Sequence, residues 1–167
     1  MSKIRGFEPV EEKFKKYKEK IVVHGKSIEV APEVVLPTRS DVRSAGYDFY
    51  SPIDIQILPA QKIVLWTNVK AYMGEDEVLM LYPRSSMGIK KGLMLANTVG
   101  VIDSSYYGNE DNDGNIGLAL LNTSGKAIDI KRGDRIVQGV FTKYLVSDNG
   151  NPNASIVRKG GIGSTGK

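Results

Sequence analysis

The chain has 167 residues, of which 41% are hydrophobic and 25% are charged. These values are typical of a single soluble globular domain and exclude general disorder. Because the sequence has no cysteine and only one histidine, His24, disulfides, thiolate zinc sites and histidine-rich metal sites are excluded. No apolar run approaches the roughly 20 residues that span a membrane, and the N-terminus has no signal-peptide pattern. We therefore expect a cytoplasmic protein without a membrane partner.

The net charge of +4 is not spread over the chain. Residues 1–26 carry eight Lys/Arg and four Glu, which accounts for the whole excess, and the remaining residues carry fifteen charges of each sign. A nucleic-acid-binding domain normally has a basic patch on its folded body. This distribution of charge therefore argues against a nucleic-acid partner.

Residues 9–20 are predicted to form a short amphipathic helix. Val10, Phe14, Tyr17 and Ile21 recur at helical spacing and would form one apolar stripe. Glutamates lie near the start of this segment and lysines near its end, as the helix dipole favours. The expected role is packing on the body or on a neighbouring subunit, and contact with nucleic acid or a membrane is the alternative.

From residue 28 onward the pattern changes to short runs rich in Val, Ile, Leu and Tyr, separated by Gly, Pro, Asn and Asp. The predicted strands lie within residues 27–36, 53–58, 62–73, 77–83, 117–124, 126–130 and 135–146. Strands at this spacing predict an all-β sandwich or barrel rather than a βαβ fold. We expect a basic extension at residues 1–27, a β domain at 28–148 and a flexible glycine-rich arm at 149–167.

The arm contains Gly161–Lys167, which matches the G-x-x-x-x-G-K pattern of a phosphate-binding loop. That loop needs a Ser or Thr after the lysine and a following helix, and neither is present in this sequence, so a P-loop NTPase is rejected. Backbone N–H groups of a glycine-rich segment can still surround phosphate oxygens. Arg158 and Lys159 add positive charge, so the arm is predicted to close over an anion.

Pro83–Gly88 follows a predicted strand and contains Arg84, Ser85 and Ser86. A guanidinium group matches phosphate oxygens and hydroxyl groups can donate hydrogen bonds to them. The segment is therefore a candidate phosphate site, although an exposed turn is the simpler interpretation when it is considered alone.

In Asn97–Gly108, Asp103 closes an apolar run and Tyr106 follows three residues later. In a β-hairpin, Asp103 would lie at a strand end with Tyr106 beside it. Such an aspartate is either a turn former or a general base that orients and deprotonates water.

Ala45–Asp48 and Gly133–Gln138 each look like a turn that leads into a strand. Asp48 and Gln138 supply oxygen ligands, which could hold the water shell of magnesium.

Together and in this order, these segments resemble the five motifs of the trimeric dUTP diphosphatase (dUTPase) family. The matching segments are Ala45–Asp48, Arg84–Ser86, Gly100–Tyr106, Gly133–Gln138, and Arg158 with Gly160–Gly166. Lys3–Glu8 and the long loop Tyr107–Gly117 further resemble a branch from Gram-positive bacteria and their phages. The resemblance implies a jelly-roll-like fold, a homotrimer, and magnesium-assisted hydrolysis of dUTP to dUMP and pyrophosphate.

The resemblance also implies roles for single residues, with each active site built by three chains. Asp103 would orient the attacking water and Tyr106 would pack under the deoxyribose. The edge of uracil would be recognised by Asn97, Gly100, Val101 and Ile102. The α- and β-phosphates would be bound by Arg84, Ser85 and Ser86, and magnesium would be bound through water by Asp48 and Gln138. The γ-phosphate would be covered by Arg158, Gly161, Gly163, Ser164 and Thr165. Ile162 stands where the family usually has a Phe stacked on uracil, so an aliphatic cover or another aromatic would replace it.

Two other functions fit parts of this sequence. A dCTP deaminase shares the fold but needs a glutamate beside the base, where this chain has Asp103 and Tyr106. A binding protein on the same scaffold would contact a regulatory protein partner through the N-terminal segment or through the loop at residues 109–116, which is expected to be acidic and solvated. The retained chemical groups in all five motifs favour the hydrolase.

Overall fold

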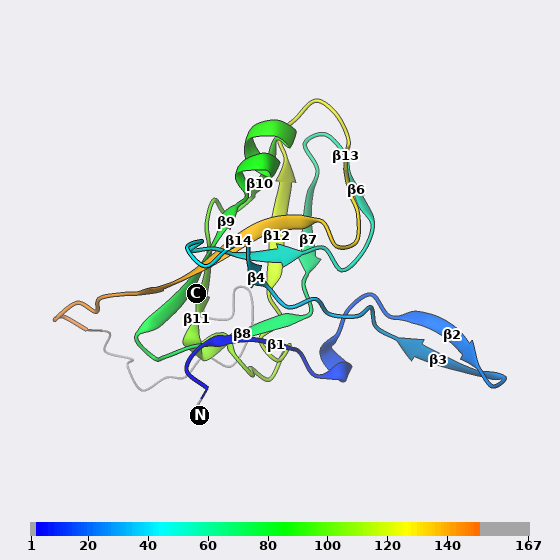
Figure 1. The fold of residues 1–167 in the computed structure, drawn as a ribbon, viewed down its shortest axis with the longest axis horizontal. Coiled ribbons are helices and arrows are strands. Elements are labelled where there is room, and N and C mark those ends of the chain that lie inside the picture. Colours follow the sequence, from blue (N-terminus) through cyan, green and yellow to red (C-terminus); the bar gives the residue numbers. More distant parts are fainter. Residues whose placement is uncertain (1–2, 151–167) are drawn as a thin grey trace.

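The computed structural model describes residues 3–150, and the fold is almost entirely β (Figure 1). No helix in this part of the chain is long and apolar enough to cross a membrane. The elements in chain order are β1 (Gly6–Pro9), η1 (Glu12–Phe14), β2 (Glu19–Val23), β3 (Lys26–Val30), β4 (Thr38–Arg39), β5 (Tyr47–Tyr50), β6 (Ile55–Ile57), β7 (Lys62–Trp66), β8 (Val69–Tyr72), β9 (Glu77–Pro83), η2 (Ser86–Lys91), β10 (Leu93–Leu95), β11 (Gly100–Asp103), η3 (Ser104–Tyr106), β12 (Gly117–Asn122), β13 (Ile128–Ile130) and β14 (Arg135–Lys143).

Two antiparallel sheets form the body. The larger has the strand order β11-β9-β14-β5-β4, and the smaller has the order β10-β12-β7. The remaining strands of the described residues form three two-stranded sheets: β1 with β8, β6 with β13, and β2 with β3. The all-β prediction is confirmed. Each expected apolar run contributes a strand, and the run at residues 62–73 is divided into β7 and β8.

The core lies between the inner faces of these two sheets. Side chains of β12 alternate, so that Leu118 and Leu120 are fully buried while their neighbours are partly exposed. Leu65 of β7 and Leu79 and Leu81 of β9 belong to the same cluster. This alternation is the period-two pattern of a sheet with one buried face, and burying each such leucine contributes about 1.5–3 kcal/mol. The core therefore holds in place the strand ends that carry the site.

The helix predicted for residues 9–20 is wrong. The segment forms only the single 3₁₀ turn η1, Tyr17 has a φ of 63°, and β2 begins at Glu19. Its backbone N–H groups are used by the body instead: the N–H of Glu11 donates to Asp113 Oδ2 at 2.7 Å and that of Lys16 to Asn68 Oδ1 at 2.8 Å. A short lysine-rich helix is only marginally stable in water. The tertiary hydrogen bonds to Asp113 and Asn68 therefore stabilise the observed conformation more than the helix would be stabilised by its own backbone hydrogen bonds.

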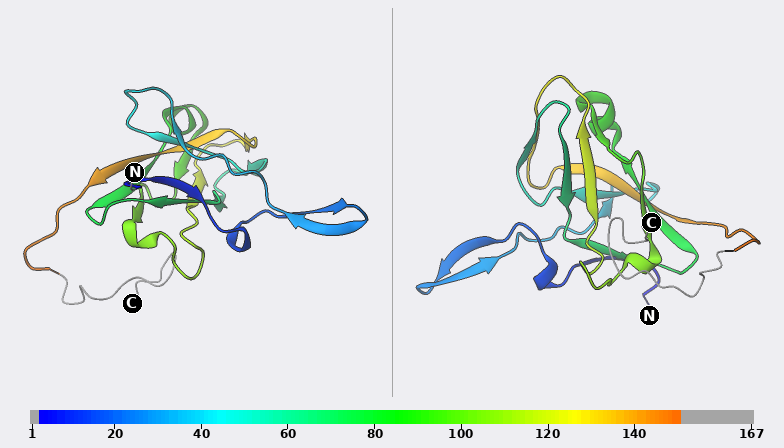
Figure 2. Two further views of the ribbon diagram at one scale, coloured as in Figure 1. Left: turned by 60° about the horizontal axis from the view of Figure 1, so that its bottom comes forward. Right: turned by 180° about the vertical axis from the view of Figure 1, so that it is seen from behind.

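Two segments project from opposite sides of the body. The β2–β3 hairpin extends to one side and residues 144–150, after β14, extend to the other (Figures 1 and 2). Ile21 and Ile28 pair across the hairpin and are about two-fifths exposed, whereas Leu145 is 99% exposed. Both projections therefore present apolar side chains that residues 3–150 leave exposed.

Candidate active site

A pocket of about 320 Å³ gathers residues from three of the predicted motifs. It lies where β5, β14 and the turn after β9 meet. Its lining is entirely polar or small: Ser40, Ser44, Gly46, Asp48, Arg84, Ser85, Ser86 and Gln138. The structure thus joins the candidate phosphate residues to the candidate magnesium residues, although they come from distant parts of the sequence.

Strand register brings the two magnesium candidates together. Asp48 on β5 is directly opposite Gln138 on β14 in an antiparallel pair. Residues paired in this way have Cβ atoms about 4.5–5.5 Å apart on one face of the sheet. Gly46 leaves room for the amide, because a Cβ at this position would lie 2.5 Å from Gln138 Oε1.

The carboxylate of Asp48 is the electrostatic centre of the pocket. It is only 5% exposed, and its Oδ1 lies 2.8 Å from Arg84 Nε. Its Oδ2 lies 3.3 Å from Arg135 Nη1 and accepts a hydrogen bond from Ser40 Oγ at 3.1 Å. A buried carboxylate needs such partners to offset its desolvation. Asp48 therefore holds two guanidinium groups at the edge of the pocket.

The same contacts test the fit of a metal ion. Residues 3–150 contain no cluster of three His, Cys, Asp or Glu side chains, so a cage made only of protein ligands is absent there. One carboxylate and one amide oxygen fit Mg²⁺, which keeps several waters and takes further ligands from substrate phosphates. Because Arg84, Arg135 and Ser40 already occupy the carboxylate oxygens of Asp48, contact through water fits better than direct coordination.

Arg84, Ser85 and Ser86 lie where β9 turns into η2. The backbone N–H groups of Met87 and Gly88 both donate to the carbonyl of Arg84 at 2.9 Å, which forms the tight turn. Ser85 and Ser86 are exposed at the start of η2, and both line the pocket. The expected placement of a guanidinium and two hydroxyl groups at one strand end is confirmed.

Asp103 lies far from this pocket in the same chain. It is the last residue of β11, where it pairs with Val78 of β9, whereas Arg84 comes six positions later, just beyond the end of β9. At about 3.3 Å per residue, six positions along a strand place Val78 and Arg84 roughly 20 Å apart. One chain alone therefore does not bring the candidate general base to the candidate phosphate residues.

The hairpin expected around Asp103 differs in its pairing. Asp103 does end a strand, but β11 pairs with β9, while the preceding β10 pairs with β12. Asn97 is exposed in the turn between β10 and β11, where the N–H of Thr98 donates to the carbonyl of Leu95 at 3.0 Å. Gly100 is buried, Val101 is exposed and Ile102 is partly buried along β11. The segment crosses from one sheet to the other because each strand finds its partner in a different sheet.

Tyr106 is buried beside Asp103, and its hydroxyl donates to the carbonyl of Asn115 at 2.8 Å. The loop that contains Asn115 was expected to be acidic and solvated; Glu110 and Asp111 are exposed as expected, but the rest of the loop is not solvated. Asn109, Asp113 and Asn115 are each no more than 7% exposed. Asparagine and aspartate side chains satisfy one another and nearby backbone groups, so a polar sequence can be buried here.

Asp113 links this loop to the rest of the body. Its two oxygens lie 2.9 Å and 2.8 Å from Lys70 Nζ on β8. Lys70 Nζ also lies 4.9 Å from the centre of the Tyr107 ring. The Tyr107 hydroxyl donates to Glu8 at 2.5 Å. This hydrogen bond is the main cause, and burial the second, that raises the pKa of Tyr107 to about 12.

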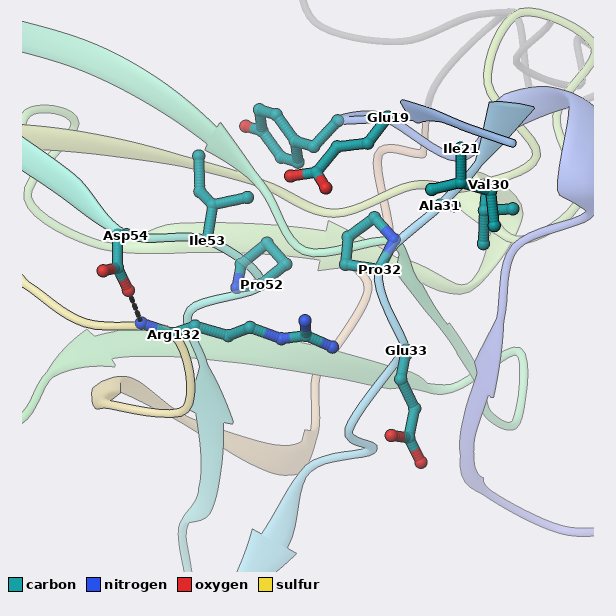
Figure 3. A pocket seen from close by; sticks show the side chains of 11 residues that line it. Glu19, Ile21, Val30, Ala31, Pro32, Glu33, Pro52, Ile53, Asp54 and Arg132 are labelled. Atoms are coloured by element: carbon teal, nitrogen blue, oxygen red, sulfur yellow. Dashed lines mark hydrogen bonds between the residues drawn. The ribbon is translucent and has the colours of Figure 1, made fainter. Parts of the chain in front are cut away.

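A larger pocket, of about 560 Å³, lies between the β2–β3 hairpin and the body (Figure 3). Ile21, Pro32, Pro52 and Arg132 are among its lining residues, and the N–H of Arg132 donates to Asp54 Oδ1 at 2.8 Å. Arg132 borders the fourth motif, but none of the candidate site residues lines this pocket. Chemistry rather than size therefore identifies the site.

Sequence reasoning missed Ser40, Ser44 and the ion pair of Arg135 with Asp48. Arg135 lies within a motif, but its direction depends on a bulge in the β5–β14 pairing near this residue. The substrate candidates of the arm, Arg158, Gly161, Ile162, Gly163, Ser164 and Thr165, lie outside the described residues.

Comparison with known proteins gives a consistent assignment. The sequence model of the dUTPase family matches residues 32–166. The deoxyuridine 5'-triphosphate nucleotidohydrolase of Lactococcus lactis is 41% identical over 164 residues, which cover 98% of this chain and 99% of that protein. The crystal structure of dUTPase from Streptococcus mutans is 36% identical with a TM-score of 0.70, covering 86% of this chain and 98% of that one.

A dUTPase from phage phi11 of Staphylococcus aureus shares the fold at 20% identity, with a TM-score of 0.65 over 87% of this chain and 94% of that chain. Fold, motifs and relatives together define a nucleotidohydrolase of the jelly-roll type, as the sequence predicted. The chain belongs to the dUTPase family, and its relatives from Lactococcus lactis and Streptococcus mutans agree with the predicted Gram-positive branch.

Proposed function

We propose that the protein hydrolyses dUTP to dUMP and pyrophosphate in a homotrimer, with each active site assembled from different chains. The observation that carries this proposal is the separation of the two halves of the site. Arg84, Ser85 and Asp48 share one pocket, while Asp103 pairs with Val78, about 20 Å from Arg84 along β9. A symmetric oligomer joins two such half-sites by bringing one chain's Asp103 to its neighbour's pocket.

The pocket supplies the chemistry that a triphosphate needs. Arg84 forms charge-assisted hydrogen bonds with phosphate oxygens, and the hydroxyls of Ser85 and Ser86 donate to the same group. These residues bind the α- and β-phosphates in the proposal. The Arg84–Asp48 ion pair keeps the guanidinium oriented at the edge of the pocket before substrate arrives.

Asp48 and Gln138 hold Mg²⁺ through its waters in the proposal. Their side by side position on β5 and β14 supports this role. When bound, Mg²⁺ neutralises developing charge on the phosphates. Because both residues are fixed by strand pairing, little reorganisation is needed when the ion and its waters arrive.

Asp103 acts as the general base. Its carboxylate accepts a proton from water as the water oxygen forms a bond to the α-phosphorus. The bond from that phosphorus to the oxygen bridging to the β-phosphate breaks, and pyrophosphate leaves with the electron pair. The exposed position of Asp103 at the end of β11 leaves room for water and for a neighbouring chain.

The uracil and sugar are recognised by the segment around β11. Asn97 and the backbone of Gly100, Val101 and Ile102 form hydrogen bonds with the edge of uracil, and Tyr106 packs under the deoxyribose. A site built for hydrogen bonds with one base edge rejects another base strongly, because its own groups would be left unpaired.

In the proposal the C-terminal arm closes over the γ-phosphate through Arg158, Gly161, Gly163, Ser164 and Thr165, and Ile162 covers the base. The exposed apolar residues of the segment leading to the arm support an interaction with a neighbouring chain. Leu145 is 99% exposed and Val146 is 76% exposed. A cytoplasmic location suits this activity.

The test is pyrophosphate release from dUTP with Mg²⁺, compared with dCTP, dTTP and UTP, for the original protein and Asp103→Ala. We expect turnover of dUTP alone and a loss of about 10²–10⁴-fold in kcat for the variant, as for removal of a general base. Ammonia release from dCTP would instead support a deaminase. Tight binding of dUTP without pyrophosphate release would support a binding protein on this scaffold.

A further inference from the structure

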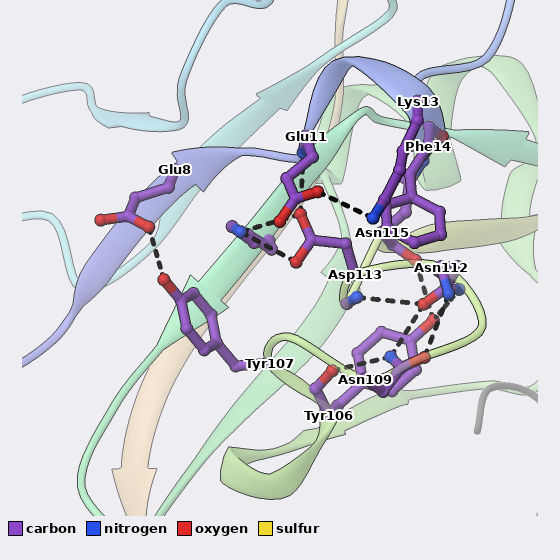
Figure 4. A network of polar contacts seen from close by, with 12 residues as sticks. Glu8, Glu11, Lys13, Phe14, Tyr106, Tyr107, Asn109, Asn112, Asp113 and Asn115 are labelled. Atoms are coloured by element: carbon purple, nitrogen blue, oxygen red, sulfur yellow. Dashed lines mark hydrogen bonds and ion pairs between the residues drawn. The ribbon is translucent and has the colours of Figure 1, made fainter. Parts of the chain in front are cut away.

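Tyr106 is held at both ends by asparagines of the loop that follows it (Figure 4). Its hydroxyl donates to the carbonyl of Asn115 at 2.8 Å and accepts from Nδ2 of Asn112 at 2.7 Å. Its backbone carbonyl accepts from Nδ2 of Asn109 at 2.8 Å. The far end of the ring and the main chain are therefore both fixed by residues 109–115, the clamp loop.

The amide of Asn112 is oriented by the same loop. Its Oδ1 accepts from Nδ2 of Asn109 at 2.8 Å and from the N–H of Gly114 at 3.0 Å. Since Oδ1 is engaged by two donors, Nδ2 must point the other way, toward the Tyr106 hydroxyl. The donor that positions the ring is thus fixed and cannot be exchanged for an acceptor by rotating the amide.

The clamp loop needs a close backbone approach to Tyr106. Gly114 has a φ of 80°, and a Cβ there would lie 2.8 Å from the carbonyl oxygen of Tyr106. Asp113, just before it, also has a positive φ, of 59°. Its bidentate ion pair with Lys70 and its hydrogen bond from the N–H of Glu11 stabilise this backbone.

We propose that Asn112 is a positioning residue that acts through the Tyr106 hydroxyl to fix the ring against the sugar and so enforce selection of deoxyribose over ribose. This inference rests on the proposed function, in which Tyr106 packs under the deoxyribose. A ring excludes an extra hydroxyl only if it cannot move aside, and displacements of about 1 Å are enough to change rates strongly. Two hydrogen bonds at the phenolic end restrict both ring rotation and side-chain displacement.

The test compares Asn112→Ala, Tyr106→Phe and the double variant, with Glu110→Ala as a matched control on an exposed position of the same loop. Steady-state kinetics with dUTP and UTP are measured for each, together with the midpoint of thermal unfolding. We expect Asn112→Ala to raise KM for dUTP about tenfold, the effect of losing one well-placed hydrogen bond, with kcat changed less. The preference for dUTP over UTP should narrow by a similar factor.

The double variant separates positioning from general stability. If Asn112 acts through the hydroxyl, the double variant should be no more impaired than Tyr106→Phe alone, because the shared contact is lost only once. Additive effects, or a fall in unfolding temperature with unchanged KM and unchanged sugar preference, would overturn the inference. No turnover of dUTP by the unmodified protein would instead overturn the proposed function, so the two failures are distinct.

Discussion

The phosphate pocket and the clamp loop position polar side chains by different means. In the pocket, the pairing of β5 with β14 places Asp48 opposite Gln138, and the end of β9 presents Arg84. The clamp loop is not held by strand pairing. Its backbone is fixed by side-chain amides, a buried ion pair and a glycine with a φ of 80°. Substitutions in the pocket should therefore affect substrate binding more than stability, and substitutions in the clamp loop should affect both.

Among substitutions in the phosphate pocket and the clamp loop, the largest effect is expected for Arg84→Gln. Removing the guanidinium deletes the positive charge that would bind the phosphates. It also leaves the Asp48 carboxylate with one fewer cationic partner. We expect kcat/KM for dUTP to fall by about 10²–10³, as for loss of one electrostatic donor. Steady-state pyrophosphate release measures this effect. The control Lys90→Gln, on the exposed part of η2, should keep kcat/KM within about twofold.

Asp113→Asn tests the ion pair on the clamp-loop side. It keeps the shape of the side chain but leaves the buried Lys70 without its carboxylate partner. Breaking a buried pair in this way is expected to lower the free energy of unfolding by about 3–5 kcal/mol. Urea unfolding measures the loss, and Glu110→Gln on the same loop should change it by less than about 0.5 kcal/mol. Equal stability of both variants would contradict the role given to the pair.

Gly46→Ala tests the packing of the pocket at one atom. The added Cβ would lie 2.5 Å from Gln138 Oε1, so the amide must shift. We expect about a tenfold loss in kcat/KM, most marked at low Mg²⁺, because small displacements of a binding group are costly. A titration of activity against Mg²⁺ checks this, and unchanged activity at every Mg²⁺ concentration would remove Gln138 from the proposed ion site.

The smallest effect is expected from Tyr107 at high pH. Its folded pKa of about 12 exceeds the usual value of 10.0, chiefly because its hydroxyl donates to Glu8. The neutral tyrosine therefore stabilises the fold fully below pH of about 10, and this contribution is lost as pH rises through about 12. Tyr107→Phe should flatten the decline in stability between about pH 10 and about pH 12. Urea unfolding midpoints across that range measure the difference, and identical slopes would contradict the assignment.

The sequence predicted the pocket better than the clamp loop, for a physical reason. Strand periodicity indicated most of the sheet, and motif spacing identified Asp48, Arg84 and Gln138, which the register then brought together. Residues 9–20 have a helical spacing of apolar residues, but long-range hydrogen bonds to Asn68 and Asp113 determine their structure. Such contacts depend on residues far away in the sequence and leave no local pattern.

The clamp loop shows the same limit. Glu110, Asp111 and Asp113 have the composition of a solvated turn, and nothing in their spacing indicates that Lys70 would be buried against Asp113. The two glycines that the structure requires at a close approach, Gly46 and Gly114, were likewise not distinguishable from ordinary turn glycines. The hydrogen-bond partners of polar side chains in a loop depend on the three-dimensional structure and leave no pattern in the sequence.

The most direct test of the central claim is complementation between two inactive variants. Asp103→Ala and Arg84→Gln are co-expressed with different affinity tags, and oligomers that contain both are purified in two steps. If each site takes Asp103 from one chain and Arg84 from its neighbour, every mixed trimer has one intact site in three and recovers about one third of the original activity. If both residues act within one chain, no intact site can form, and mixed oligomers without dUTP hydrolysis would contradict the account.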